Sequence, residues 1–305
     1  ILAISPGFYT FLGIRFFVGM GLGGELPVAA TYIADIYRGT KRSQMLILAD
    51  SFWALGWLVA SFLSFLLTPV LGWRGILVVT AIAGVFAIVL RKHIHETAPK
   101  STGTQHWLVS LKTTFKPWTL MLWLAWFMVM FSYYGMFMWL PSIMVDKGYG
   151  IVNSFGYTTI IVVAQLPGYL CASWLAKRIR VKYVFAIYML GTAFGAIMFG
   201  QSASALLIVI SGCVLSFFNL GAYGAIIALT PELYAHNIRG TMTGMAQGIG
   251  RIGAIFGPLL IGVLMDHQIS ISIIFVIFMV SLLIGSIAVL ALPSADQQPN
   301  GEVTQ

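Results

Sequence analysis

Four charged residues stand inside long apolar runs of this sequence: Arg15, Glu25, Asp50 and Arg251. A charge within a hydrocarbon layer is costly, so such residues usually face a water-filled path, a solute or a partner charge. A carboxyl group in a partly dry site can bind and release a proton as its surroundings open and close. We therefore expect Glu25 or Asp50 to be a proton site with Arg251 as its partner. The alternative is a permanent structural ion pair. Arg15 is expected to bind an anionic solute, to gate the proton relay, or to be structural.

An acid, a tyrosine and an arginine recur at equal spacing in two places. The acid Asp35 begins a phrase that ends at Arg42, and Glu232 begins one that ends at Arg239; in each, a tyrosine follows the acid by two residues. Both ends are offset by 197 residues, since 232 − 35 and 239 − 42 are equal. Each copy lies between two apolar runs. The pattern predicts one structural unit used twice in the same orientation, as in transporters built from two related helical halves.

Composition places the chain in a membrane. Of the 305 residues, 59% are hydrophobic and only 9% are charged, whereas soluble domains carry about 25% charged residues. These charges are too few to cover a globule of this size, so lipid must cover much of its surface. The net charge of +8 does not indicate nucleic-acid binding, because the basic residues separate the apolar runs instead of clustering on one polar domain.

No set of residues in the sequence predicts a metal site or a cofactor. Cys171 and Cys213 both lie within apolar runs at no metal-binding spacing, and we interpret them as packing residues. His93, His95 and His106 share one polar stretch, but no acid or cysteine completes a coordination set at helical spacing, so solvated linker histidines are the preferred interpretation. No nucleophile motif or paired metal-binding set points to an enzyme.

Nine apolar runs are candidates to cross a bilayer, which requires about 20 residues. Basic residues orient them: 13 fall in the gaps after odd-numbered runs, and only Arg74 and Lys147 fall in the gaps after even-numbered runs. The first set of gaps and the C-terminus are therefore predicted to be cytoplasmic. Gly-x-x-x-Gly spacings that begin at Gly19, Gly244 and Gly253 predict close helix approach. The runs are 8–33, 43–68, 76–90, 118–140, 156–175, 183–199, 206–230, 242–265 and 272–292.

The parity of the spans predicts that further spans precede the first. Nine spans with a cytoplasmic C-terminus require an external N-terminus, and no basic region precedes the first apolar run. The offset of 197 residues makes the repeat six spans long, so three more spans are expected before Phe8 and twelve in all. We therefore predict an all-α membrane protein with an incomplete N-terminal half (1–91), a cytoplasmic linker (92–117), a six-helix C-terminal half (118–292) and a disordered cytoplasmic tail (293–305).

Four short stretches carry a resemblance to a known family. Residues 15–21 (RFFVGMG) resemble the fourth-helix signature of the major facilitator superfamily. Residues 231–241, which begin Pro-Glu-Leu-Tyr and end Arg-Gly-Thr, resemble the loop between helices ten and eleven in its sugar-porter-like and organic-ion members. Residues 23–28 (GGELPV) and 51–57 (SFWALGW) look closest to bacterial niacin (nicotinate) and related metabolite:proton symporters. By this resemblance the chain holds helices 4–12 of a twelve-helix major facilitator fold.

The resemblance implies roles for polar and aromatic residues within the spans. In this superfamily helices one, four, seven and ten line the central cavity, which makes Glu25 and the residues named below candidates for solute contact. Aromatic rings there would suit a flat, ring-shaped solute, whereas simple aromatic packing or an interfacial belt is the alternative for each tyrosine. The candidates are Tyr133, Tyr134, Asn219 and Tyr223, with Gln165 as the clearest polar residue of the fifth span.

The repeated phrase lies at the predicted cytoplasmic ends of helices. Acid–arginine pairs there would hold an inner gate shut, and because each pair is wet, a network is needed. Simple positive-inside topology is the alternative, which explains the arginines but not the acids. One loop departs from the family: members often have Asp-x-x-Gly-Arg-Arg after helix eight, but residues 176–182 (AKRIRVK) contain no acid. The predicted gate residues are Asp35, Arg42, Glu232 and Arg239.

Taken together, the residues and the resemblance predict a secondary transporter that crosses the plasma membrane several times. The resemblance implies proton-coupled uptake of niacin or a similar aromatic or organic acid by alternating access. We expect a monomer that needs no cofactor and binds no nucleic acid. A sugar or organic-cation transporter of the same superfamily is the first alternative. The second is a membrane sensor that kept the fold and lost transport, which would be expected to carry a large soluble signalling domain.

Overall fold

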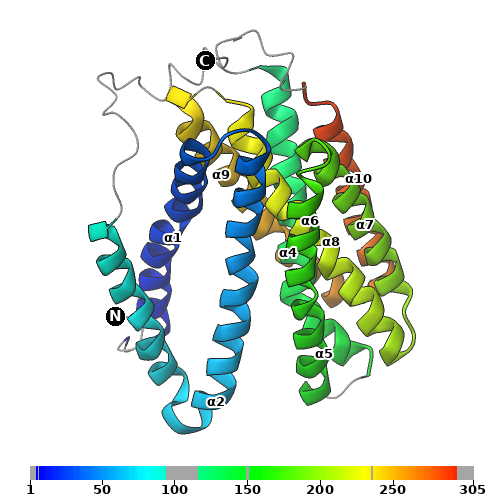
Figure 1. Ribbon diagram of the computed structural model, residues 1–305. Helices are drawn as coiled ribbons and strands as arrows, with labels where there is room; N and C mark the ends of the chain where they lie inside the picture. The colour runs from blue at the N-terminus through cyan, green and yellow to red at the C-terminus, as the bar shows by residue number, and fades with distance from the viewer. Residues whose placement is uncertain (1–4, 6, 94–115, 149–150, 235, 294–305) are drawn as a thin grey trace.

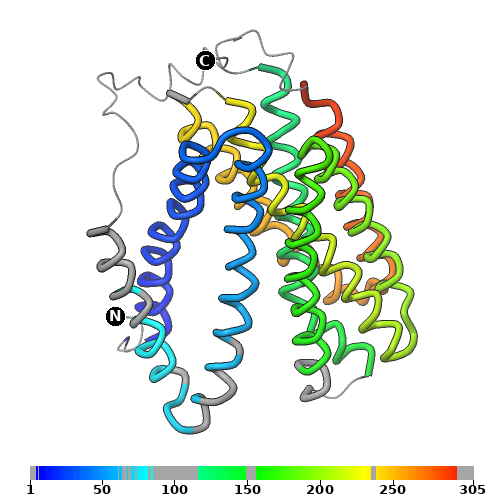
Figure 2. Tube along the Cα trace, viewed as in Figure 1, coloured from blue at the N-terminus to red at the C-terminus, as the bar shows by residue number. Residues whose placement is uncertain are grey.

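The computed structural model describes residues 5, 7–93, 116–148, 151–234 and 236–293, and within these ranges the regular structure is helical with no strand (Figure 1; Figure 2). The predicted all-α membrane fold is therefore confirmed. The predicted linker and tail lie almost entirely outside the described residues. In chain order the helices are α1 (Phe8–Ile36), α2 (Gly39–His93), α4 (Pro117–Asp146), α5 (Ile151–Val163), α6 (Gln165–Leu175), α7 (Val181–Gln201), α8 (Ala205–Glu232), α9 (His236–Asp266) and α10 (Ile271–Leu290).

Eight helices in the described part of the chain are long and apolar enough to cross a membrane. Two of the predicted spans are the two parts of α2, which turns sharply at Gly72 with φ 62° and ψ 178°. A side chain at that positive φ would be strained, so glycine is what allows the turn. The third predicted span, 76–90, lies in the second part of α2 and is not among the eight; many of its side chains are outside the described residues.

One predicted span is broken into two helices. α5 ends at Val163 and α6 begins at Gln165, so Ala164 interrupts the expected span 156–175. Pro167 explains the break, because its nitrogen carries no hydrogen and its ring crowds the carbonyl four residues earlier, on Val163. The break makes Gln165 the first residue of α6.

The helices form two groups that meet at one end (Figure 1). α1 and α2 form one group and α4 to α10 form the other; α1 packs against α9, and α2 packs against α6 and α8. At the shared end α1 and α8 finish and α2 and α9 begin, and the connection between α6 and α7 lies beside them. We call this the Asp35 end. It holds the segments that the sequence assigns to the cytoplasm, while its side of the membrane stays a prediction.

Close backbone contact joins α4 to α9. A Cβ atom added at Gly253 would lie 2.3 Å from the carbonyl oxygen of Phe127, and one at Gly257 would lie 2.3 Å from that of Phe131. Only glycine permits this approach, so the predicted close packing is confirmed for this spacing. Around the spacings that begin at Gly19 and Gly244 no atom of the described chain lies within 4 Å of an added Cβ. Within the described residues those two spacings meet no neighbouring helix, so for them close packing stays a prediction.

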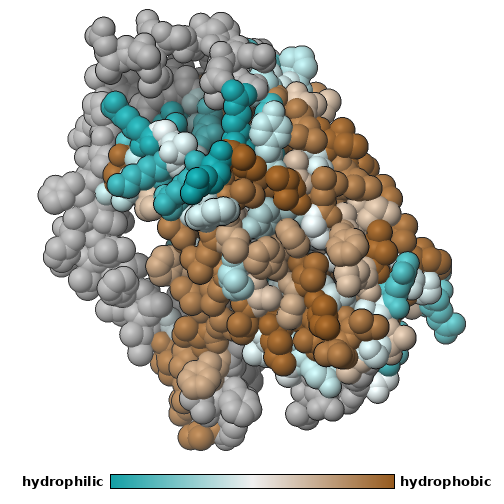
Figure 3. Space-filling model, turned by 45° about the vertical axis from the view of Figure 1, so that its right-hand side comes forward, coloured by the Kyte–Doolittle hydropathy of each residue, from teal (hydrophilic) through white to brown (hydrophobic). Residues whose placement is uncertain are grey.

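Apolar side chains cover much of the surface. Figure 3 shows a broad hydrophobic area on one face, with hydrophilic residues gathered towards the upper end, which is the Asp35 end. Exposed large hydrophobic residues include Phe16 on α1, Phe194 on α7 and Ile287 on α10. Water would disfavour so extended an apolar surface, whereas lipid covers it without penalty.

Candidate functional site

An acid from α2 is buried at the contact with α6. Asp50 is 6% exposed, and its Oδ2 accepts a hydrogen bond of 2.8 Å from the hydroxyl of Tyr169. Its other oxygen, Oδ1, is buried without a hydrogen-bond partner among the described residues. A buried ionised carboxylate is costly unless it is paired and hydrogen-bonded. One donor is little compensation, so Asp50 is a buried acid with one of its two oxygens left unpaired in the described structure.

Aromatic rings lie beside this acid and join the two helix groups. The Nε1 of Trp53, on α2, donates to the hydroxyl of Tyr133, on α4, at 3.2 Å. The centre of the Tyr133 ring lies 5.1 Å from that of Tyr134 and 6.3 Å from that of Tyr223, on α8. Trp126 packs edge-on against Tyr223 with 5.9 Å between ring centres. We call these five residues the aromatic cluster; Tyr133 and Tyr223 both interact electrostatically with Asp50.

Two buried amide side chains have no partner. Gln165 on α6 and Asn219 on α8 are fully buried, and the oxygen and nitrogen of both side chains lack a hydrogen bond within the described structure. Leaving a buried polar atom unpaired is costly, and such atoms often mark a place where water or a ligand binds. Asn219 precedes Tyr223 by about one helical turn, so it shares a face of α8 with a member of the aromatic cluster.

The other predicted charged residues are placed differently. Arg251 on α9 donates from Nη1 to the hydroxyl of Tyr134 at 3.2 Å, so it lies beside the aromatic cluster. No ion pair joins it to Glu25 or Asp50 in the described part of the chain, so the expected acid–arginine partnership is not formed. Glu25 and Arg15 are exposed on α1. The structure therefore brings Asp50 and Arg251 to the site and leaves the other two outside it.

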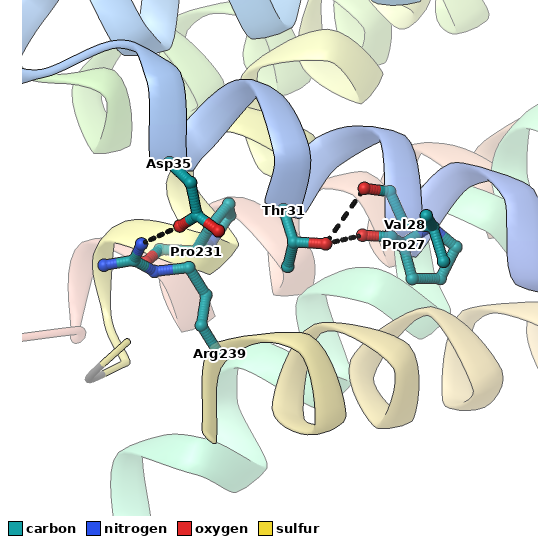
Figure 4. A network of polar contacts seen from close by, with 6 residues as sticks. All are labelled: Pro27, Val28, Thr31, Asp35, Pro231 and Arg239. Carbon is teal, nitrogen blue, oxygen red and sulfur yellow. Dashed lines mark hydrogen bonds and ion pairs between the residues drawn. The ribbon is translucent and has the colours of Figure 1, made fainter. Parts of the chain in front are cut away.

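The two copies of the repeated phrase meet at the Asp35 end. Asp35 and Arg239 form an ion pair with 2.9 Å between Oδ1 and Nη1, and both side chains are largely buried. Arg239 also donates from Nε to the carbonyl of Pro231 at 3.0 Å. Figure 4 shows the arginine reaching from α9 to the end of α1. The acid of the first copy thus pairs with the arginine of the second.

The reverse exchange links α2 with α8. The hydroxyl of Ser43 donates to Oε1 of Glu232, and Arg42 interacts favourably with Glu232. Arg42 also interacts favourably with Asp35 and unfavourably with Arg239, so the four charges form one network. Asp35 is therefore paired with the arginine of the other copy, while Glu232 accepts from Ser43 and is attracted to Arg42 without an ion pair in the described structure. The spacing in the sequence identifies the four residues but leaves their pairing open.

Known proteins share this sequence and this fold. A family model described as the Major Facilitator Superfamily matches residues 1–168 and, again, residues 157–305. The chain belongs to this superfamily. It is 42% identical over 307 residues to a Bacillus subtilis (strain 168) protein named for niacin/nicotinamide transport, NiaP. The alignment covers 98% of this chain and 76% of that protein. It is 37% identical over 294 residues to the niacin transporter NiaP of Acinetobacter baylyi. This alignment covers 85% of this chain and 67% of that protein.

A solved structure shares the fold. The superfamily transporter FucP, in its outward conformation, aligns with a TM-score of 0.80 at 17% identity, over 95% of this chain and 77% of that one. The superfamily and both relatives are transporters. This superfamily member is therefore a secondary transporter with several membrane-spanning helices, and not an enzyme. Within the described residues no three metal-binding side chains gather.

Three residues of the site were not singled out from the sequence. Tyr169 lies one turn after Gln165 and shares its face of α6, so the predicted position of Gln165 was a signal that could have identified Tyr169. Trp53 lies within the run 51–57 that carries the resemblance. Trp126 offers no signal beyond being an aromatic residue in a span, because its neighbours come from a different helix.

Proposed function

We propose that this superfamily member takes up niacin or a similar aromatic acid together with a proton, by alternating access. It would act as a monomer in the plasma membrane with its C-terminus in the cytoplasm. The observation that carries the proposal is the buried Asp50–Tyr169 pair beside the aromatic cluster. The names of the two NiaP relatives support niacin as the solute.

The aromatic cluster supports a flat solute with an acidic group. Rings at 5 to 6 Å spacings can pack against a further ring by stacking or edge contact. Arg251 lies beside Tyr134, and a guanidinium binds a carboxylate in a two-point geometry. The unpartnered amides of Gln165 and Asn219 could hydrogen-bond a ring nitrogen. These side chains would bind nicotinate without a metal or a cofactor.

Asp50 supports proton coupling. Its carboxyl group has one hydrogen-bond donor, Tyr169, and one oxygen without a partner. A proton on that oxygen removes the buried charge. Water that reaches the site lowers the cost of the charge and so favours release of the proton. Because Trp53 lies on the same helix and bonds Tyr133 of the other helix group, a movement of one group against the other changes the surroundings of the acid. Proton release would thus be tied to reorientation.

The crossed charge network supports a gate at the Asp35 end. The ion pair of Asp35 with Arg239, the hydrogen bond of Ser43 to Glu232 and the electrostatic attraction between Arg42 and Glu232 all link one helix group to the other. Separation of the two helix groups at this end must break all of these interactions together. The network therefore stabilises the closed arrangement, and we assign it the role of the cytoplasmic gate.

The experiment is uptake of labelled nicotinate into proteoliposomes with an imposed pH gradient. We expect accumulation driven by an inward proton gradient and abolished by a protonophore. Benzoate should compete, whereas a hexose and a quaternary ammonium ion should not. Uptake indifferent to the gradient would contradict proton coupling, and competition by the sugar or the cation alone would contradict the aromatic-acid assignment.

A further inference from the structure

A cavity of about 490 Å³ lies at the Asp35 end, apart from the aromatic cluster. Its walls come from both helix groups: the first turn of α2, the connection between α6 and α7, the end of α8 and Pro293, three residues after the end of α10. The lining residues on the α2 side include Arg42 and Ser43, and those on the α8 side include Glu232. The cavity is thus part of the gate region, and no member of the aromatic cluster lines it.

The charge of the lining is strongly positive. Five basic side chains face one acidic side chain, Glu232. Four of the five come from the segment 176–182, in which no acid stands. The guanidinium of Arg178 is held over the ring of Trp174 at 5.6 Å, and Lys182 donates to the carbonyl of Leu292 at 3.1 Å. The basic residues are Arg42, Lys177, Arg178, Arg180 and Lys182.

Two further features of the wall favour an anion. The Nε of Arg42 is buried and has no hydrogen-bond partner in the described structure. Helix α7 begins at Val181 on the cavity wall, and no side chain caps its first turn. The N–H groups of a helix start and their partial positive charge attract anions, phosphate above all. A cavity with cations, a helix start and a buried guanidinium nitrogen without a partner is therefore built to receive a negative group.

We propose that this cavity binds a phosphate group, carried either by an anionic phospholipid or by a free phosphate. The shared chemistry is a tetrahedral oxyanion that accepts several charge-assisted hydrogen bonds at once. Apolar lining residues, among them Leu229, Leu233 and Pro293, leave room for an organic part beside the phosphate. This site is independent of the identity of the transported solute.

Occupancy of the cavity is linked to closure of the Asp35 end. Arg42 and Ser43 contribute to the wall from one helix group, and the basic segment contributes from the other. A phosphate that bridges them binds the closed arrangement better than one in which the walls are apart, so it shifts the population towards closure. The linkage is reciprocal: a change that loosens the gate must weaken phosphate binding.

The test is thermal unfolding of the purified protein in a neutral detergent free of phosphate. One arm titrates inorganic phosphate at constant ionic strength, and the other titrates phosphatidylglycerol against phosphatidylcholine. We expect a saturable rise of Tm in at least one arm. A rise in both arms assigns the site to free phosphate and lipid alike, and a rise with phosphatidylglycerol only assigns it to the lipid. No saturable rise in either arm would overturn the proposal.

Variants place the binding in the cavity. The double change Lys177→Gln and Arg178→Gln should raise the half-saturating concentration by about tenfold or more, because hydrogen bonds to charged groups are the strong ones. Both side chains are exposed, so the fold should survive. Lys41→Gln is the matched control, since Lys41 is an exposed cation one residue from Arg42 that does not line the cavity. Equal weakening by the control would reduce the effect to general surface charge and refute the site.

A third variant tests the linkage to the gate. Arg239→Gln removes an ion pair of the gate but no lining residue, and it should weaken phosphate binding several-fold. Unchanged affinity in this variant would refute the linkage to closure.

Discussion

At the scale of single residues, burial separates two acids that the sequence treats alike. Glu25 and Asp50 lie at similar depths, about 12 and 10 Å from the ends of their spans at 1.5 Å per residue. Depth along a helix axis says nothing about which face a residue occupies, and both helices are apolar on every side. The structure places Asp50 against Tyr169 and leaves Glu25 exposed. Asp50 was predictable as a candidate, but its partner was not.

Tyr133 offers a test of ring contact against hydrogen bonding. Its ring contacts Tyr134, Phe137 and Tyr223, and its hydroxyl accepts from Trp53. If the aromatic cluster binds the solute, Tyr133→Ala should weaken nicotinate binding about three- to tenfold, since an aromatic pair contributes about 0.5–1.5 kcal/mol. Tyr133→Phe keeps the ring and should change affinity by less than about threefold. Equilibrium binding of labelled nicotinate measures both, and equal losses in the two variants would contradict a role for the ring.

At the scale of helices, composition and periodicity predict where spans lie but not how closely they pack. The spans were found because apolar runs of the right length are rare outside membranes. Three Gly-x-x-x-Gly spacings looked equivalent, yet only Gly253 and Gly257 meet a neighbouring backbone. The reason is that the spacing fixes a helix face, while the identity of the facing helix depends on the tertiary arrangement.

Gly253 therefore predicts a stability difference with an internal control. Gly253→Ala would place a methyl group 2.3 Å from the carbonyl oxygen of Phe127, so we expect the free energy of unfolding to fall by about 1–3 kcal/mol. Gly244→Ala, on the same helix with open space around it, should be neutral or slightly stabilising. Thermal unfolding in detergent compares them. Equal stability of the two variants would contradict the close contact between α4 and α9.

At the scale of the whole molecule, the repeat in the sequence becomes a contact between the two helix groups. The offset of 197 residues indicated two related units in one orientation. It could not show that Asp35 of the first unit pairs with Arg239 of the second, because that pairing depends on how the units face each other. In the structure the two copies of the phrase meet through the Asp35–Arg239 ion pair, and the second copy bonds α2 through the Ser43–Glu232 hydrogen bond. Three further helices ahead of Phe8 stay a prediction.

The crossed pairing predicts which double-mutant cycle shows coupling. Asp35→Asn combined with Arg239→Gln should show a coupling energy of about 1 kcal/mol in the free energy of unfolding. The cycle of Asp35→Asn with Arg42→Gln should show less, because those two residues share no ion pair in the described structure. A larger coupling in the second cycle would contradict the exchange of partners between the copies.

Asp50 carries the central claim, that its protonation drives solute accumulation. The most direct measurement compares labelled nicotinate accumulation under a proton gradient with solute exchange in the absence of a gradient, for Asp50→Asn and for the control Glu25→Gln. The Asp50→Asn protein should lose accumulation and keep exchange, because an amide cannot cycle a proton but leaves the aromatic cluster in place. The Glu25→Gln protein should keep both. Accumulation by Asp50→Asn at the level of the unsubstituted protein would contradict the account.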